Sequence, residues 1–581
     1  MAASVKTLSL LFTAILAGLN CAEAQHRLDV EVLPCFGPAP LAFDTLGLET
    51  GTRRSVSVTR CDLLLSAAAL QREDGGWIGV EKWSAYLGLR DGRNHFALVN
   101  APDGKFTRLR FHIGVPPQIN HGDPSRYPPR HPLNPLVNGM HWGWQGGYVF
   151  AALEGRWRGP DGTMGGYSYH LANDEHLMTV ELPVNLDLSR DQTLHLKLDL
   201  KPVFEGMEIG ETNASTHSRP EDALAGELCA KLVAAFRVES VAPTPSRAEV
   251  AAKVNARIAP GATPYRFTYP AGFPRPDLPA DNPLTNEGVA FGRHLFQDTR
   301  LSGNGTQSCA SCHVADQGLG DSRRFSVGAF GDTGTRQAMP LFNLAWKSSF
   351  FWDGRAPTVR AQVLQPIENP VEMHAALPEV VSRLSADPKC RAMAAAAFGS
   401  EEIDSDLVAR ALEQFLLTRV SGNSKFDRAM RGEDSLSEEE ARGERLFNTE
   451  YDPARGLRGA DCFHCHGGPM FQSLAFANNG LDAEPEDAGR SAVTGHAGDR
   501  GKFAVPTMRN IALTAPYMHD GRFATLEEVV DHYSGGVKRS DTLDANLAKH
   551  PAGGLNLSPQ DKRALVAFLR ALTDEDFPTG N

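Results

Sequence analysis

The chain has 581 residues, with 58 basic side chains against 70 acidic ones and a formal net charge of −12. This length exceeds one ordinary hydrophobic core and predicts two or three domains. Hydrophobic residues make up 41% and charged residues 22%, which excludes a disordered or fibrous chain, and the acidic balance argues against a nucleic-acid or anionic-membrane partner.

The first predicted element is a leader at residues 1–24. Lys6 precedes an apolar run from Leu8 to Leu19, and Ala22-Glu-Ala24 follows it. A basic start, a short apolar stretch and an A-x-A site indicate a secretory signal peptide. The stretch is too short for a stable spanning helix. We therefore expect a periplasmic or secreted protein without a membrane span, in an oxidising compartment.

Residues 25–240 mostly alternate between apolar and polar side chains, which predicts an antiparallel all-β sandwich or barrel. Leu109, Phe111 and Ile113, for example, fall on one face of a predicted strand. Cys35 and Cys61 also lie in this region. In an oxidising compartment we expect them to form a disulfide in preference to staying as two unpaired buried thiols.

Residues 241–282 are rich in proline, which predicts an extended linker. Beyond it the apolar pattern becomes helical, and a segment is duplicated: Gly292-Arg-His-Leu-Phe296 recurs as Gly443-Glu-Arg-Leu-Phe447, each shortly before a cysteine pair. We therefore predict two similar α lobes at 283–430 and 431–581. In the second, Ser437 and Glu440 have the spacing of a capping box.

Two motifs in these lobes carry the chemistry. Cys309-Ala-Ser-Cys312-His313 and Cys462-Phe-His-Cys465-His466 both have the pattern C-x-x-C-H. This spacing lets two thiols attach to the vinyl groups of one haem while the adjacent histidine binds the iron. A zinc knuckle or a redox C-x-x-C would not explain the histidine at both motifs. The sequence therefore predicts two covalently bound c-type haems.

Residues 283–578 resemble the bacterial di-haem cytochrome c peroxidase and MauG superfamily. The matching stretches are Leu301-Ser-Gly-Asn-Gly-Thr-Gln-Ser-Cys-Ala-Ser-Cys-His, Phe351-Trp-Asp-Gly-Arg, Asn369-Pro-Val-Glu-Met, Val505-Pro-Thr-Met-Arg-Asn and Ala515-Pro-Tyr-Met-His-Asp-Gly. The resemblance implies a mostly α di-haem cytochrome c domain with two pseudo-symmetric lobes. It also implies an oxidoreductase that reacts with hydrogen peroxide.

The resemblance assigns roles around the first haem. Ordinary peroxidases have a distal histidine in a V-G-H stretch, where this chain has Ala329. The first iron is therefore expected to be five-coordinate and open, as in MauG-like enzymes. Glu372 matches the distal acid–base carboxylate that moves the peroxide proton, and Gln362 matches a neighbouring distal glutamine. His374 is the competing base.

At the second haem, Tyr533 follows the Thr525-Leu-Glu-Glu helix where ordinary peroxidases have a methionine ligand. The resemblance therefore implies a His/Tyr haem, and a phenolate favours higher iron oxidation states. The alternative is that Tyr533 only packs and that Met518, His519 or His532 is the ligand.

The resemblance also places Trp352 between the two haems, where an indole can relay an electron or simply pack. The family holds a calcium ion between the lobes, and the matching positions here are Gln337, Ala504 and Pro506. Gln337 replaces the usual asparagine ligand, so the calcium prediction rests on a substituted position.

The stretches 114–121, 132–134 and Met140-His-Trp-Gly-Trp-Gln-Gly-Gly-Tyr148 resemble the copper-binding MbnP family, whose genes neighbour a MauG-like enzyme in methanobactin operons. In that pair the haem enzyme oxidises a tryptophan of its partner to kynurenine, which helps to create a copper site. The resemblance implies Trp144, or in second place Trp142, as the oxidised residue. The expected copper ligands are His121 and His170, with His131, His141 and His217 as second choices.

Three functions follow. The first is a di-haem oxidoreductase that uses hydrogen peroxide to reach a high-valent state and oxidises a tryptophan of its own N-terminal domain to kynurenine, completing a copper site. The second is a peroxide-scavenging cytochrome c peroxidase whose β domain docks a small electron-donor protein or stores copper. The third is an electron carrier with a copper-storage module, which the missing histidine at Ala329 argues against.

Overall fold

The structure is a computed structural model. It describes residues 26–51, 54–80, 82–128, 130–142, 147–210, 213–216, 218–219, 221–244, 258–270, 272–453 and 456–577. The predicted leader, Trp144 and His217 lie outside these residues. Among the helices described, none combines the length and the apolar character that crossing a bilayer requires.

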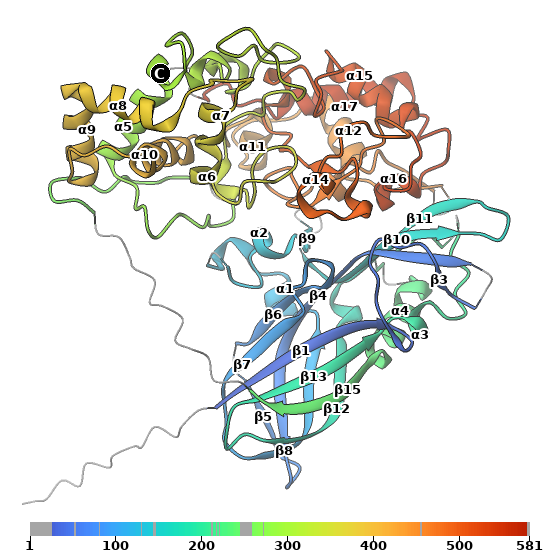
Figure 1. Cartoon of the computed structure of the whole chain (residues 1–581). Coiled ribbons are helices and arrows are strands. Elements are labelled where there is room, and N and C mark those ends of the chain that lie inside the picture. Colours follow the sequence, from blue (N-terminus) through green and yellow to red (C-terminus); the bar gives the residue numbers. More distant parts are fainter. Residues whose placement is uncertain are drawn as a thin grey trace, which may run out of the picture.

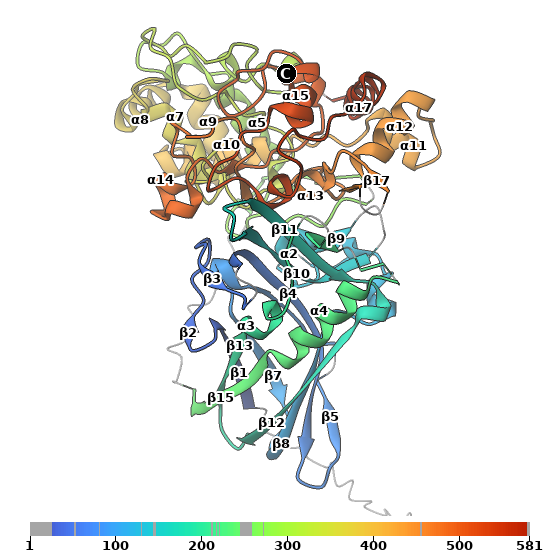
Figure 2. The same ribbon diagram turned by 90° about the vertical axis from the view of Figure 1, so that its right-hand side faces the viewer.

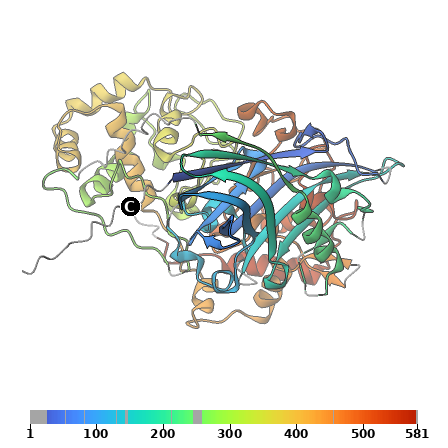
Figure 3. The same cartoon turned by 90° about the horizontal axis from the view of Figure 1, so that it is seen from below.

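Two bodies are stacked, a β domain from the N-terminal half and a helical domain from the C-terminal half (Figures 1 and 2). The predicted multidomain fold, β-rich and then mostly α, is confirmed. Seen from below (Figure 3), the β domain covers mainly the second lobe, and the first lobe extends to one side. Contacts between β11 and α16 place the β domain directly on that second lobe.

The β domain consists of two sheets around one apolar core. Its strands are β1 His26–Phe36, β2 Ala39–Pro40, β3 Leu48–Glu49, β4 Ser55–Arg72, β5 Trp77–Gly79, β6 Ser84–Gly88, β7 His95–Ala101, β8 Lys105–Ile113, β9 His141–Trp142, β10 Gly147–Arg158, β11 Met164–Ala172, β12 Met178–Asp187, β13 Gln192–Asp199, β14 Ser215–Thr216 and β15 Phe236–Pro243. Its helices are α1 Pro117–Asn120, α2 Pro135–Asn138, α3 Lys201–Phe204 and α4 Ala223–Ala234.

The larger sheet has the order β12-β8-β4-β10-β11-β14, and the smaller has β15-β13-β1-β2. Leu109, Phe111 and Ile113 of β8 are completely buried, as the alternation predicts. The sheets are not purely antiparallel, however, because β1 pairs with β13 and β11 pairs with β14 in parallel. Period-two alternation reports which face is buried, and it carries no information on strand direction.

The expected disulfide between Cys35 and Cys61 is wrong, because both are free, buried thiols. Cys35 lies in β1 of the smaller sheet and Cys61 in β4 of the larger one. Burial raises the pKa of Cys61 further than that of Cys35, and both thiols are therefore held protonated. The two cysteines are part of the packing in separate sheets.

The helical domain repeats one helix crossing. Its helices are α5 Asn286–Phe296, α6 Val359–Val363, α7 Gln365–Glu368, α8 Leu377–Ala386, α9 Pro388–Phe398, α10 Ser405–Leu417, α11 Lys425–Met430, α12 Glu438–Phe447, α13 Phe463–His466, α14 Ser491–Thr494, α15 Leu526–Asp531, α16 Ala545–Ala548 and α17 Pro559–Ala571. A Cβ at Gly292 of α5 would lie 1.9 Å from the Ala411 carbonyl of α10. A Cβ at Gly443 of α12 would lie 1.9 Å from the Ala564 carbonyl of α17. The duplicated segments thus make the same close crossing in each lobe.

The segment between the domains is less of a free linker than its prolines suggest. Strand β15 continues to Pro243, three residues into the predicted linker. Residues 258–270 and 272–282 run along the first lobe, where Trp346 donates its indole N–H to Pro274 O at 2.7 Å and stacks edge-on against Phe273. Their packing against Trp346 fixes this segment to the first lobe.

Candidate functional site

The first haem motif begins in a short 3-10 turn at Cys309–Ser311. His313 donates its Nδ1–H to Leu319 O at 2.9 Å, since a carbonyl can only accept. That bond leaves Nε2 free for iron, and burial lowers the pKa of His313, which keeps the ring neutral. Burial, with Cys312 and Glu372 nearby, raises the pKa of Cys309 to about 12.

The second motif repeats this design. It lies in α13, where His466 donates its Nδ1–H to Pro506 O at 3.1 Å. Burial lowers the pKa of His466 to about 4, so this ring is also neutral and presents Nε2. All four motif cysteines are free thiols. The donor set at both motifs therefore fits a covalently attached haem.

Glu372 lies beside the position where a distal histidine is missing. The N–H of Ala329 donates to Glu372 O at 2.7 Å, which fixes the two loops together. The Glu372 carboxylate accepts from Asn369 Nδ2 at 2.6 Å, and burial raises its pKa despite that bond. Gln362 lies half-buried on α6, whereas His374 is exposed, with its ring against Phe330. These surroundings favour Glu372 over His374 as the acid–base group.

Tyr533 lies in a π-helical turn, His532–Gly536, at the end of α15, and such turns are frequent at functional sites. Burial raises the pKa of its phenol. A hydrogen bond with Asn479 lowers that pKa, whereas the thiols of Cys465 and Cys462 raise it further. The phenol is therefore close to the cysteines of the second motif.

The competing ligands of the second haem have other partners. His532 Nε2 is bonded to Asn479 O at 3.0 Å, and the ring of His519 stacks on Phe503 at 3.7 Å. Met518 Sδ accepts from Asn479 Nδ2 at 3.3 Å, which places it near Tyr533. The Tyr533 phenol is also bonded to Asn479, so these contacts do not separate the candidates, and Tyr533 as the sixth ligand stays a prediction.

Trp352 connects the two lobes. Its indole N–H donates to Gln337 O at 2.8 Å, and its own carbonyl accepts from Ala504 N at 2.8 Å. Two residues after Ala504, the Pro506 carbonyl accepts from His466. Two hydrogen bonds and a short stretch of chain therefore link Trp352 to the second histidine ligand.

The expected calcium residues surround Trp352. Gln337 and Ala504 bond to it directly, while the Gln337 amide donates to Asp321 O at 3.0 Å and the Pro506 carbonyl already accepts from His466. The hydrogen bond from His466 uses one lone pair of the Pro506 carbonyl oxygen. Calcium binding at this place stays a prediction.

The β domain is attached to the second lobe by buried polar contacts. Arg156 of β10, which is 6% exposed, donates two hydrogen bonds to Leu543 O, at 2.6 and 3.1 Å. Burial lowers the pKa of Arg156 to about 10. Next to it, a Cβ at Gly166 of β11 would lie 2.1 Å from Ala545 O, so the strand lies directly on α16. Neither contact was predicted from the sequence.

The expected copper ligands lie in different surroundings. His121 is exposed and donates to Asp174 at 2.9 Å. His131 stacks on Tyr127, and His141 meets the ring of Tyr148 edge-on. His170 is buried in β11, where its Nε2–H donates to Glu154 at 2.8 Å. Within the described residues these histidines do not form a close cluster of ligand atoms.

A buried network at the interface includes residues that the sequence analysis did not single out. The ring of His170 lies 5.5 Å from that of His464, between centroids, and His464 is the histidine inside the second haem motif. His464 pairs with Asp461 at 2.7 Å, and Asp461 also binds Lys549 and His550, at 3.0 and 2.8 Å. The sequence did contain a signal for His464, because a histidine stands there between the two cysteines of the haem motif.

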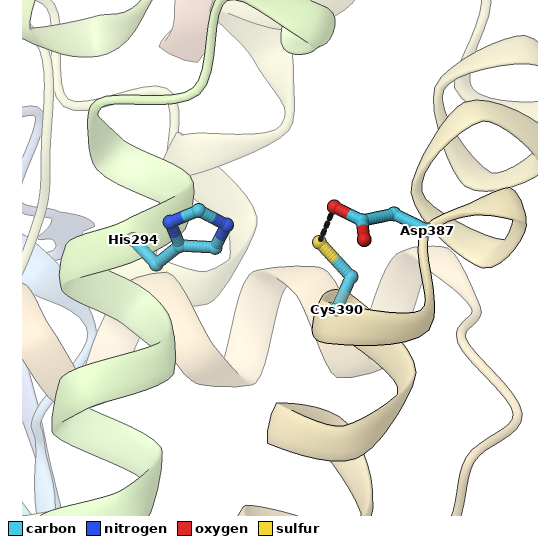
Figure 4. Close-up of side chains that lie close together, drawn as sticks. All are labelled: His294, Asp387 and Cys390. Atoms are coloured by element: carbon cyan, nitrogen blue, oxygen red, sulfur yellow. Dashed lines mark hydrogen bonds between the residues drawn. The ribbon is translucent and has the colours of Figure 1, made fainter.

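In the part of the chain that the structure describes, one other cluster offers metal ligands: His294, Asp387 and Cys390 have ligand atoms within 4.8 Å of one another (Figure 4). Arg300, however, donates to Asp387 at 2.9 Å and to Cys390 Sγ at 3.3 Å. Its positive charge neutralises the acid and opposes a cation. The cluster is therefore an ion-paired helix start at α9, since Asp387 also caps that helix.

Known proteins match both halves. A family model described as di-haem cytochrome c peroxidase matches residues 286–435, and a model described as MbnP matches residues 25–218. Methylamine utilization protein MauG of Methylorubrum extorquens is 37% identical over 313 residues, which are 53% of this chain and 84% of that protein. Cytochrome c551 peroxidase of Nitrosomonas europaea is 36% identical over 267 residues, which are 45% and 77% of the two chains.

A solved crystal structure of a MauG-like protein associated with microbial copper homeostasis is 36% identical. It covers 54% of this chain and 98% of its own, with a TM-score of 0.49. The sequence matches agree with the paired haem motifs and with the duplicated lobes. The chain belongs to the di-haem cytochrome c peroxidase and MauG family, and a region that matches MbnP precedes its haem domain.

Proposed function

We propose that this oxidoreductase uses hydrogen peroxide to oxidise a tryptophan of its own β domain to kynurenine, and that the product completes a copper site. The observation that carries this proposal is the domain interface. Trp142 is 8% exposed, and it lies at the end of the β domain that contacts the second haem lobe. Fusion holds the two partners at high effective concentration.

The residues divide the work between the lobes. Bound haem would supply the peroxide chemistry and store oxidising equivalents. Glu372 would take the proton from one peroxide oxygen and return it to the other, and its half-buried, hydrogen-bonded position suits a carboxylate with that task. Trp352, bonded to the Ala504–Pro506 segment, would carry electrons between the lobes.

The overall reaction balances with peroxide as the only oxidant. Conversion of tryptophan to N-formylkynurenine removes four electrons and four protons and adds two oxygen atoms from water. Two peroxide molecules accept those electrons and protons and leave four waters. Hydrolysis then releases formate and kynurenine. The new aryl amine offers a donor to copper, beside neutral histidines such as His141, whose pKa burial lowers to about 4.

A second candidate is a scavenging peroxidase, and the 36% identity to a cytochrome c551 peroxidase favours it. In that case a small electron-donor protein would reduce the haems, and all seven tryptophans would stay intact.

The test compares three samples of the mature protein: haem-loaded, haem-loaded and treated with peroxide, and haem-free because it is produced without haem. Peptide mass mapping and a copper titration are carried out on each. We expect kynurenine and tighter copper binding only in the peroxide-treated sample. Intact tryptophans with fast turnover of a reduced small cytochrome would establish the scavenging peroxidase instead.

A further inference from the structure

Three aromatic rings form a line from the β domain into the second haem motif. The ring centroids of Trp142 and His170 are 6.1 Å apart, and those of His170 and His464 are 5.5 Å apart. His464 stands between Cys462 and Cys465, the two cysteines that would anchor the second haem. The line therefore begins at a tryptophan and ends at a haem attachment site.

The three side chains are buried: Trp142 is 8% exposed, His170 is 5% exposed, and the side chain of His464 is 1% exposed. Buried rings in contact give electrons a medium without mobile water, whose reorganisation would slow transfer. Each histidine is also fixed by a carboxylate, His170 by Glu154 at 2.8 Å and His464 by Asp461 at 2.7 Å.

The carboxylates themselves are held by cations. Arg60 donates to Glu154 at 2.9 Å, and Lys549 lies 3.0 Å from Asp461. Such buried ion pairs are weak evidence for stability, because apolar residues often serve as well. Docking is already provided by Arg156 and Gly166. The network is therefore better explained by the positions in which it holds the two rings.

We propose that His170 and His464 form the electron-transfer bridge between the second haem motif and Trp142, which makes Trp142 the residue oxidised first. This inference rests on the proposed function and adds its route and its substrate residue. In the first step one electron leaves the Trp142 indole, which becomes a radical cation, and reduces the haem domain by one equivalent. No bond forms or breaks in this step. Hydrogen peroxide is the terminal oxidant, and each molecule takes two electrons and two protons to give two waters.

The experiment uses haem-loaded full-length protein and hydrogen peroxide. His464→Leu and His170→Leu remove a ring, and His464→Phe and His170→Phe retain one. His195→Leu is the matched control, because it removes a histidine that is also paired with a carboxylate, Glu31, but lies outside the line of rings and its ion pairs. Stopped-flow absorbance follows the reaction with peroxide and the decay of the oxidised state. Peptide mapping follows Trp142.

We expect the peroxide reaction to be unchanged in the His170 variants and in His195→Leu. Decay of the oxidised state and oxidation of Trp142 should slow by ~10-fold to ~10²-fold in the two leucine variants, because misplacement by about an ångström can cost rates on that scale. The phenylalanine variants should recover most of the rate, and His195→Leu should match the unsubstituted protein.

Equal Trp142 oxidation in the His464 and His170 leucine variants and in His195→Leu would overturn the bridge, as would oxidation of a different tryptophan at an unchanged rate. His170 lies outside the haem motif, so its variants decide the matter even if substitution of His464 impairs haem attachment. Intact tryptophans in the unsubstituted protein would instead refute the proposed function, which is a distinct result.

Discussion

The two lobes share a helix crossing but differ in what surrounds their haem motifs. Gly292 and Gly443 make equivalent close contacts, and both motif histidines donate Nδ1–H to a backbone carbonyl. Around the first motif the neighbours are Ala329 and a half-buried, hydrogen-bonded Glu372. Around the second motif the neighbours are Tyr533 and His464, whose ring contacts His170 of the β domain.

This difference indicates how a duplicated helix crossing can hold two sites with separate tasks. The residues of this frame, such as Gly292 and Gly443, lie where the helices cross, so both copies keep them. Residues that face the open side of a haem, or another domain, are free to diverge. We therefore propose that the first lobe reacts with peroxide and the second exchanges electrons with the β domain.

The largest effect is expected at Glu372, which serves the first lobe alone. Glu372→Gln keeps the shape and the bond to Asn369 but removes the proton carrier. The peroxide reaction should slow by ~10²-fold to ~10⁴-fold, the usual contribution of a general acid–base group. Stopped-flow kinetics with hydrogen peroxide measure it, and Glu368→Gln, an exposed neighbour, is the matched control.

The pH profile provides a second readout for the same residue. Burial raises the pKa of Glu372 above the ordinary carboxyl value, so protonation removes the base at a higher pH than for an exposed glutamate. The peroxide rate should therefore fall as pH drops through this raised pKa. In Glu372→Gln that limb of the profile should vanish, and its survival would assign the proton to another group.

Tyr533→Phe should change the second haem alone. Loss of the phenol oxygen removes the proposed sixth ligand, so the low-spin ferric signal should be replaced while the high-spin signal of the first haem stays. Electron paramagnetic resonance of the ferric protein distinguishes the two. Tyr517→Phe, which alters a buried phenol bonded to Ile511 O, serves as the control. An unaltered low-spin signal would mean that Met518, His519 or His532 is the ligand.

Much of the frame was predictable from the sequence because it depends on local patterns. The capping box at Ser437 and Glu440 is present at the start of α12, and Ser558 caps α17. The paired haem motifs were predictable for a similar reason, since thiol spacing and the adjacent histidine lie within five residues.

The interface was not predictable because its parts are distant in sequence and bland in pattern. Arg156 reads as an ordinary polar residue in a strand, and its partner is a backbone carbonyl, Leu543 O, which leaves no trace in the sequence. In the sequence Gly166 resembles a turn glycine, but its lack of a side chain lets α16 pack directly on β11. The parallel pairing of β1 with β13 likewise depends on chain routing.

Arg156→Met should weaken the attachment of the β domain to the second lobe. Two hydrogen bonds from a buried guanidinium are lost, and bonds to charged groups contribute about 1.5–3 kcal/mol each at most. We expect the two domains to melt separately, with the haem spectra intact, and limited proteolysis to become faster at the segment between them. The control is Arg158→Met, which changes an exposed residue on the same face of β10. Its melting and its proteolysis should match those of the unsubstituted protein. A single unchanged transition in Arg156→Met would mean that other contacts determine docking.

The smallest effects test whether the lobes share their frame. In Gly292→Ala and Gly443→Ala the new methyl group would lie 1.9 Å from a carbonyl oxygen of the crossing helix, so the helices must move apart. Overpacking of this kind costs about 1–3 kcal/mol. Because the two crossings are equivalent, the losses in free energy of unfolding should be alike, which chemical denaturation followed by circular dichroism can measure.

Gly226→Ala, in α4 with nothing within 4 Å of the new Cβ, should instead stabilise by about 0.5–1 kcal/mol through helix propensity. If one lobe tolerated its alanine while the other did not, the divergence would extend from the haem surroundings into the frame itself, and the lobes would be less alike than their glycines indicate.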